Sequence, residues 1–390
     1  MRWQYRTTVL ALCTLAFFVT YFARMGISPV IPFIAADFDV TNTQIGLALS
    51  GMWLAYGVSQ FPSGVLGDRY GEKPVILVAV GGTSLASLLL AFAPAFAAFV
   101  AIAVVLGAVA GLHYAVATTL LSRTYEELGR AVGIHSLGGP LAGLVAPVAA
   151  SWVGVRYGWR PAVAVALLVG LPIFILVAWR IRPTEPRRPD QPMRERFERS
   201  ALVELVSRPP IAFTLAIAMI GTFIVQGLLT FLPTFLVEYH RYSATLAGTA
   251  FSGFFVVRTG SQFAIGEFSD RYGRDLAIGG SMFAGAVGLL ALVVADGLTA
   301  VAVAILFAGT GSSFFSAIDP RFLDQFGDRE QGAGFGLVRT VYTVVGSAGS
   351  VGVGLLADLF GWGTAFLLLA GLFAITVLSL VANWLLELGY

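Results

Sequence analysis

Two stripes of residues, each with a spacing of four, are the parts of this sequence best suited to binding a small molecule. Residues 50–71 and 252–273 read SGMWLAYGVSQFPSGVLGDRYG and SGFFVVRTGSQFAIGEFSDRYG, and ten of the 22 positions are identical. Positions four residues apart share one face of an α-helix. The stripes are Tyr56, Gln60, Gly64 and Asp68 in the first copy, and Arg258, Gln262, Gly266 and Asp270 in the second. The repeat keeps Gln, Gly and Asp but exchanges a phenol for a guanidinium. We predict that the Gly and Asp end of each stripe forms a gate and that the differing pair, Tyr56 and Arg258, recognises the ligand.

Arginine also indicates the charge of that ligand. Arg24, Arg258 and Arg339 lie inside long apolar stretches with no obvious acidic partner. A cation inside a membrane is costly and usually functional, and a guanidinium can bind a planar carboxylate through two parallel hydrogen bonds. The alternative is that some of these side chains snorkel or bond to backbone carbonyls. We predict an anion-binding site, which these further residues could complete: Tyr21, Tyr56, Gln60, Gln226, Gln262, Tyr342 and His113.

The elements that must position these residues are membrane-spanning helices. Of the 390 residues, 57% are hydrophobic and 12% are charged, whereas a soluble protein carries about 25% charged residues. Apolar runs long enough for the about 20 residues that a spanning helix needs occur at 8–35, 43–66, 74–93, 96–121, 131–153, 160–180, 210–237, 245–266, 276–295, 298–318, 332–357 and 362–386. These runs lack the alternation of barrel strands. We therefore predict an all-α integral membrane protein with twelve transmembrane helices.

The repeat also predicts the domain organisation. Gly158-Trp159 returns as Gly361-Trp362, and the offset between the copies stays at 202 to 203 residues. Since six spans is an even number, both halves enter the membrane from the same side, as parallel repeats around a central cavity do. We expect a six-helix bundle at 1–180, a linker with a short amphipathic helix at 181–208, and a second six-helix bundle at 209–390. The two stripes should then face one another across the cavity.

The distribution of charge predicts the orientation. With the N-terminus inside, 18 of the 24 Lys and Arg residues fall on the cytoplasmic side of these spans. The positive-inside rule therefore predicts a multi-pass protein of the cell (plasma) membrane with both termini cytoplasmic. A net charge of +2 is too small to suggest a nucleic-acid partner, and the single cysteine, Cys13, excludes an intramolecular disulfide. We expect no metal and no cofactor.

The first repeat carries a recognisable loop signature. The segment from Gly64 to Lys73, GVLGDRYGEK, resembles the signature G-x-x-x-D-R-x-G-R-K of the major facilitator superfamily, and residues 266–274 resemble a weaker second copy. The resemblance covers essentially the whole chain. It implies a secondary transporter that works by alternating access, and no enzyme. Glu72 departs from the pattern, because the family usually has arginine there.

The same resemblance implies which residues gate the transporter. By analogy, an aspartate in each turn faces a helix N-terminus of the other half, which the helix dipole favours; the alternative is a solvated turn. The gating residues so implied are Gly64, Asp68, Arg69, Gly71, Gly266, Asp270, Arg271, Gly273 and Arg274.

Two subfamilies show a further likeness. Tyr21-Phe-Ala-Arg24 resembles the anion:cation symporter group, whose helix-one arginine aligns with Arg24. Arg258 and Arg339 resemble the paired cations of the oxalate–formate antiporter. Both likenesses imply a carboxylate substrate. The acidic residue that often precedes the symporter arginine is replaced by Ala23.

Other functions remain to be weighed against an anion transporter. A multidrug or cation exporter of the same fold would show a deep acidic residue in the first half, which is absent. A non-transporting sensor could keep the spans and lose the gates. A co-transported proton could use His113, His135 or Asp319, although histidines at such positions can equally be structural; an exchanged anion would need no relay. The expected partners are therefore an anionic small molecule, a co-transported or exchanged ion and the lipid bilayer, and the expected state is a monomer.

Overall fold

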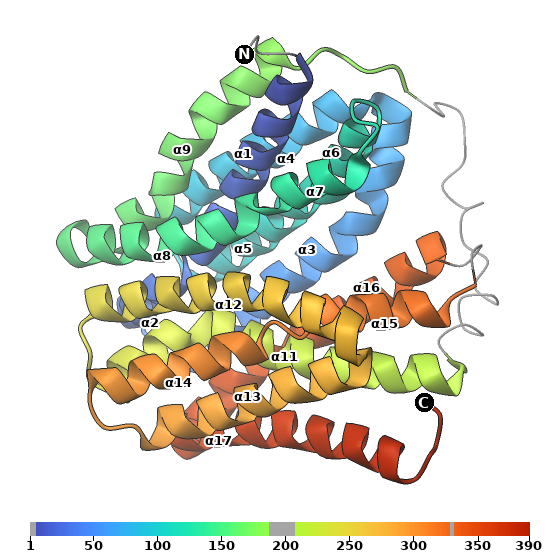
Figure 1. The fold of residues 1–390 in the computed structure, drawn as a ribbon. Coiled ribbons are helices and arrows are strands. Elements are labelled where there is room, and N and C mark those ends of the chain that lie inside the picture. The colour runs from blue at the N-terminus through green and yellow to red at the C-terminus, as the bar shows by residue number, and fades with distance from the viewer. Residues whose placement is uncertain (1–4, 187–206, 328–330) are drawn as a thin grey trace. The chain divides into compact units, whose positions relative to one another are not determined.

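The computed structural model describes residues 5–186, 207–327 and 331–390, and helices are the regular elements of this part of the chain (Figure 1). The all-α prediction is confirmed. The amphipathic helix expected within 181–208 falls largely on residues 187–206, which lie outside the described residues. Contacts group the chain into two compact units, each of which is considered by itself.

Unit 1 contains the described residues of Met1–Val40, Ala48–Arg196 and Tyr242–Ser252. Its first helix is interrupted near residues 26–30, and its fourth and fifth helices are interrupted at Leu112 and Leu137. The elements are α1 (Tyr5–Met25), η1 (Ser28–Val30), α2 (Ile31–Phe38), α3 (Asn42–Tyr70), α4 (Glu72–Ala91), α5 (Phe96–Gly111), α6 (His113–Ser122), α7 (Leu128–Ser136), α8 (Gly138–Tyr157) and α9 (Trp159–Arg180).

Unit 2 contains the described residues of Thr41–Leu47, Phe197–Arg241 and Gly253–Tyr390. Its fourth and fifth helices are interrupted too, and α17 comprises two helices joined at Gly361, where the backbone leaves the helical region. The elements are α11 (Pro209–Glu238), α12 (Ala244–Tyr272), α13 (Arg274–Val294), α14 (Leu298–Gly311), α15 (Phe315–Gln325), α16 (Gln331–Gly346) and α17 (Ala348–Leu385).

The two units repeat the same packing of helices. In unit 1, α4 packs against α5 and α9, and α1 packs against α8. In unit 2, α13 packs against α14 and α17, and α11 packs against α17 (Figure 1). Each unit also holds the first residues of the second helix of the other half, because Thr41–Leu47 groups with unit 2 and Tyr242–Ser252 with unit 1. The repeat in sequence is therefore a repeat in structure.

Length and composition support a multi-pass membrane protein. Within the described residues, nine helical stretches are long and apolar enough to cross a membrane, and the last of them, Gly334–Leu385, contains two passes joined at Gly361. The 29-residue helices α3 and α12 fall outside these nine, because they carry the polar stripes. Together these segments account for the twelve predicted spans in the described part of the chain.

Two glycines end the repeated Asp-Arg-Tyr-Gly segments for a geometric reason. Gly71 has φ 83° and ψ 160°, and Gly273 has φ 101° and ψ 154°. These backbone angles are essentially reserved for glycine. The turn lets α4 and α13 start directly after α3 and α12, so both copies place an aspartate and an arginine at the same helix end.

Candidate functional site

Arg24 is the most deeply buried cation of unit 1. Its side chain is 1% exposed, and Nε donates to the carbonyl of Thr20 at 3.0 Å. The terminal nitrogens Nη1 and Nη2 have no hydrogen-bond partner within the described part of the chain. Buried polar groups are almost always hydrogen-bonded, so these two donors point to a missing acceptor.

Three aromatic rings surround the same guanidinium. Its carbon lies 4.0 Å from the ring centre of Tyr56, 4.9 Å from that of Trp53 and 5.0 Å from that of Tyr21. Cation–π contacts of this kind stabilise a desolvated guanidinium, but they leave its N–H donors unsatisfied. The structure thus brings the predicted residues Tyr21, Arg24 and Tyr56 together as one cluster, which we call the Arg24 cluster, and adds Trp53.

Close helix packing positions the cluster. A β-carbon added to Gly107 or Gly111 of α5 would collide with the backbone carbonyls of Met52 and Tyr56 of α3. A β-carbon on Gly139 of α8 would lie 3.0 Å from the ring of Phe17 and 3.5 Å from that of Tyr21. The Gly–x–x–x–Gly spacing of α5 therefore lets α3 approach closely, as small residues do in membrane proteins.

The corresponding part of unit 2 is arranged differently. Gln226 on α11 is 6% exposed, and its Oε1 has no hydrogen-bond partner among the described residues. Arg258 on α12 is half-buried, and its Nε is likewise unpaired within the described residues. A buried acceptor and an unpaired donor thus replace the ring-enclosed arginine of unit 1.

The expectation that Arg339 has no acidic partner is wrong, because it has an acidic neighbour. Asp319 of α15 accepts a hydrogen bond from the hydroxyl of Tyr342 at 3.2 Å and lies within electrostatic range of Arg339. Tyr342 follows Arg339 by three residues on α16, so both share a helix face. The sequence did not indicate this contact, because α15 and α16 are separate helices and only their packing brings the three side chains together.

The remaining predicted binding residues lie along or beside the stripes. Gln60 and Gln262 are half-buried on α3 and α12. His113 is completely buried, and its Nε2 lies 3.1 Å from the carbonyl oxygen of Cys13 on α1. No contact that the structure provides joins these three to Arg24, so their binding role stays a prediction.

The predicted gating residues differ between the two units. In unit 2, Arg274 pairs with Asp270, four residues earlier, and with Asp324 at 2.9 Å, while Arg271 pairs with Glu267 at 2.5 Å. In unit 1, the residue at the place of Arg274 is Glu72, whose fully buried side chain pairs with Arg123 at 2.8 Å.

The linker side of unit 1 completes this arrangement. The backbone N–H of Glu72 donates to Oγ1 of Thr184 at 3.0 Å, and Arg123 donates to the carbonyl of Glu185 at 3.1 Å. The departure from the family pattern at Glu72 thus has a structural reason. Gly64 and Gly266 lie among these elements with space around them, since an added β-carbon would meet nothing closer than 3.9 Å.

A second contact that is repeated in both units lies away from the Asp-Arg-Tyr-Gly turns, and the sequence did not indicate it. Trp159 Nε1 donates to Asp37 at 3.2 Å in unit 1, and Trp362 Nε1 donates to Glu238 at 2.7 Å in unit 2. Arg160 also binds Asp37, at 2.6 Å. In the sequence, the repeated Gly-Trp pair indicates where the hydrogen-bond donor lies, but it does not indicate the acceptor.

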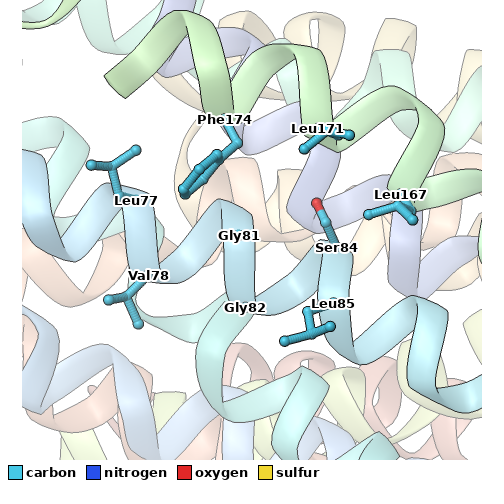
Figure 2. A pocket seen from close by; sticks show the side chains of 9 residues that line it. All are labelled: Leu77, Val78, Gly81, Gly82, Ser84, Leu85, Leu167, Leu171 and Phe174. Carbon is cyan, nitrogen blue, oxygen red and sulfur yellow. The ribbon is translucent and has the colours of Figure 1, made fainter. Parts of the chain in front are cut away.

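A pocket on unit 1 is unsuited to an anion. It lies between α4 and α9 and is lined by Leu, Val, Gly and Phe residues together with Ser84 (Figure 2). Its volume is about 490 Å³. It contains no charged side chain and is bordered by exposed apolar residues such as Val78 and Leu171. An apolar surface of this kind suits a lipid chain, so the Arg24 cluster is the better candidate for an anion site.

Comparison with known proteins agrees with the repeat, the motif and the twelve spans. The sequence pattern of the Major Facilitator Superfamily matches residues 13–256 and 236–388. The hexuronate transporter of Bacillus subtilis is 24% identical over 94% of this chain and 92% of its own length.

Two further relatives match smaller parts. The membrane sensor protein UhpC of Escherichia coli is 27% identical over 46% of this chain and 42% of its own length. The multidrug resistance protein MdtL of Escherichia fergusonii is 26% identical over 67% of both chains. Among solved structures, a bacterial homologue of the human lysosomal transporter Spinster has a TM-score of 0.82 at 16% identity, covering 98% of this chain and 96% of that one. With its duplicated loop signature and two similarly packed helical units, the chain belongs to the Major Facilitator Superfamily and is a multi-pass membrane transporter.

Proposed function

We propose that this protein is a secondary active transporter of a small organic anion, most simply a carboxylate. The observation that carries the proposal is the guanidinium of Arg24, which is 1% exposed and has two terminal nitrogens without an acceptor in the described residues. A carboxylate supplies two acceptor oxygens with the spacing of these two donors. It also supplies the charge that a buried cation requires.

Other features support an anion over a cation. In the described part of unit 1, every Asp and Glu lies at or near a helix end or in a loop, at positions 37, 39, 68, 72, 126, 127 and 185. Arg24 has no ion-pair partner among the described residues of unit 1, so its charge favours an anion. The hexuronate transporter from Bacillus subtilis has a sugar acid as its substrate, which makes D-glucuronate a suitable first probe.

The function requires the site to be exposed to each side of the membrane in turn. In transporters with two parallel six-helix repeats, substrate sites lie near the bilayer midplane and the repeats move against one another. We propose that this protein lies in the cell membrane with both termini in the cytoplasm, because the positive-inside rule places most of its arginines there.

Thermal unfolding of the purified protein with a panel of ligands tests the proposal. The panel contains D-glucuronate, short mono- and dicarboxylates, and lipophilic cations. A ligand at about 100 times its dissociation constant stabilises the folded state by about 2.7 kcal/mol, so one class of carboxylate should raise the melting temperature. Arg24→Gln should weaken binding roughly 30-fold or more, because losing one partner of a buried, hydrogen-bonded charge pair costs at least about 2 kcal/mol.

A matched control comes from Arg156. Its guanidinium lies 4.4 Å from the ring of Trp152 near the end of α8, in an exposed position. Arg156→Gln removes a cation–π arginine from the same unit and should leave the ligand-induced shift intact. Stabilisation by lipophilic cations alone would overturn the proposal in favour of an exporter of the same fold.

A further inference from the structure

Two buried histidines lie side by side in unit 1, on the same side of α1 as the Arg24 cluster. His113 opens α6 and His135 lies near the end of α7, and both are completely buried. Their ring centres are 5.4 Å apart. The fold therefore places two imidazoles together where a single structural histidine would suffice.

The hydrogen bonds of this pair leave three ring nitrogens without a partner within the described residues. Nε2 of His113 lies 3.1 Å from the carbonyl oxygen of Cys13, and since a carbonyl only accepts, that nitrogen must carry the hydrogen. Nδ1 of a neutral His113 is then a bare acceptor. Nδ1 of His113 and both nitrogens of His135 have no hydrogen-bond partner within the described residues, so a neutral pair contains two buried acceptors without a donor.

Three aromatic rings lie close to His135. The ring centres of Phe17, Tyr114 and His113 lie 5.3, 5.4 and 5.4 Å from that of His135. Burial disfavours a charge on either histidine ring, and a nearby anion would offset that cost. The pair thus has ring nitrogens that could accept a proton once an anion is close.

A stripe of α1 connects this pair to the proposed anion site. Cys13, Phe17, Tyr21 and Arg24 follow one another at spacings of four, four and three residues, so they share a helix face. The ring centres of Phe17 and Tyr21 are 6.0 Å apart, and Tyr21 lies 5.0 Å from the guanidinium of Arg24. An anion bound at Arg24 would attract a positive charge on the pair through a region of low dielectric constant.

Few other charged groups face the pair. The titratable or charged side chains on the helices that pack against α6 and α7 are Tyr5, Arg6, Cys13, Tyr21 and Arg24 of α1, Glu72 and Lys73 at the start of α4, Tyr114 of α6, Arg130 at the exposed start of α7, and Arg156 and Tyr157 at the far end of α8. Glu72 is paired with Arg123. In the described spans of unit 1, the histidines are thus the side chains whose ordinary pKa lies near neutral pH.

We propose that the His113–His135 pair is the proton-binding site of the transporter and takes up one proton when an anion binds at Arg24. The inference rests on the proposed function and specifies its coupling: the anion and the proton move together. Asp319 of unit 2 is the alternative proton carrier. It accepts a hydrogen bond from Tyr342 and lies near Arg339.

The test measures proton uptake by the purified protein in weakly buffered detergent solution when D-glucuronate, or the carboxylate that the panel identifies, is added. The wild type should take up a proton for each bound anion, and its affinity should rise as the pH falls, by at most about tenfold per pH unit for one linked proton. His113→Gln/His135→Gln keeps a donor for the Cys13 carbonyl and should lose the proton uptake, whatever its affinity for the anion. Its affinity should not change with pH.

The third histidine provides the control. His240 lies in unit 2 and contacts the carbonyl of Leu292 at 2.8 Å, so His240→Gln should behave as the wild type. The proposal is overturned if the double variant still takes up protons, and Asp319→Asn losing the uptake instead would identify the competing carrier. A structural role would change stability without changing proton uptake.

A substrate-independent measurement separates this proposal from the proposed function. If no carboxylate of the panel binds, the proposed function fails. Spectra of protein carrying ¹⁵N-labelled histidine then decide the remaining question. A first proton shared by the His113–His135 pair as the pH falls supports the proton site, and two rings that stay neutral at every pH at which the protein remains folded overturn it.

Discussion

The two units place an ion pair at the same position and give it opposite polarity. In unit 1, the acid is Glu72 at the start of α4 and the base is Arg123 after α6; in unit 2, the base is Arg274 at the start of α13 and the acid is Asp324 near the end of α15. The position of the ion pair is thus retained in both units, while the acidic and basic residues exchange places. A helix–helix connection at this position needs two opposite charges, but their order along the chain is unimportant.

The reversal changes the surroundings of the motif aspartates. Asp270 pairs with the arginine four residues later, whereas the residue four positions after Asp68 is Glu72, which binds Arg123. The pair of unit 1 is also buried, with side-chain exposures of 0% and 24%, against 57% and 26% for Asp324 and Arg274. The two copies of one sequence motif are therefore expected to differ in strength.

The largest difference should appear when these ion pairs are broken. Glu72→Gln leaves Arg123 partly buried without its partner, which should cost about 2–3 kcal/mol of unfolding free energy. Asp324→Asn breaks an exposed pair and should cost less than about 1 kcal/mol. Denaturant titration of both variants in detergent measures the difference. Equal costs would show that burial does not distinguish the pairs, and recovery of stability in Glu72→Arg/Arg123→Glu would show that polarity is interchangeable.

The sequence could predict the spans but not these contacts. Span length and hydropathy located α11 at 210–237, against Pro209–Glu238 in the structure, because the requirement to cross lipid acts along a single segment. The predicted second span, 43–66, ended before the helix does, since α3 continues through the motif to Tyr70. The turn glycine ends that helix, and hydropathy does not register it.

The sequence could predict which residues belong to the candidate site, but it could not predict which side chains contact one another. A buried arginine in an apolar stretch is visible in the sequence, so Arg24 and its neighbour Tyr21 could be named. Trp53 could not, because the packing of α3 against α1 determines that its ring contacts the guanidinium. The same limit applies to Asp319 and Arg339, which are close only after α15 and α16 have folded.

The first turns of α3 and α12 offer a second comparison, with an intermediate effect. Asp358 of α17 accepts hydrogen bonds from the backbone N–H groups of Asn42 at 3.2 Å and Thr43 at 2.7 Å and from both side chains, all within unit 2. The start of α12 is capped within its own segment, where Ser243 accepts from the N–H of Leu246 at 3.2 Å.

A cap from a separate helix should hold its helix end more firmly than a local serine. Asp358→Ala should cost about 1–2 kcal/mol, and Ser243→Ala about 0.5–1 kcal/mol. Hydrogen exchange measures the effect locally, as faster exchange of residues 42–47 in the first variant and of 244–249 in the second. Unchanged exchange at Asn42 and Thr43 in Asp358→Ala would refute the capping role.

A third comparison concerns the tryptophans of the repeated Gly-Trp pairs. Glu238 accepts one hydrogen bond from Trp362, whereas Asp37 accepts from both Trp159 and Arg160. Trp362→Phe therefore removes the single donor that the described residues provide to Glu238 and should cost about 1.5 kcal/mol, the lower end for a hydrogen bond to a charged group. Trp159→Phe should cost about 0.5 kcal/mol, because Arg160 still binds the carboxylate at 2.6 Å. The double variant Trp159→Phe/Arg160→Gln should restore the larger cost to unit 1. If unfolding shows equal losses for the two single variants, the second donor at Asp37 contributes nothing and the two contacts are equivalent after all.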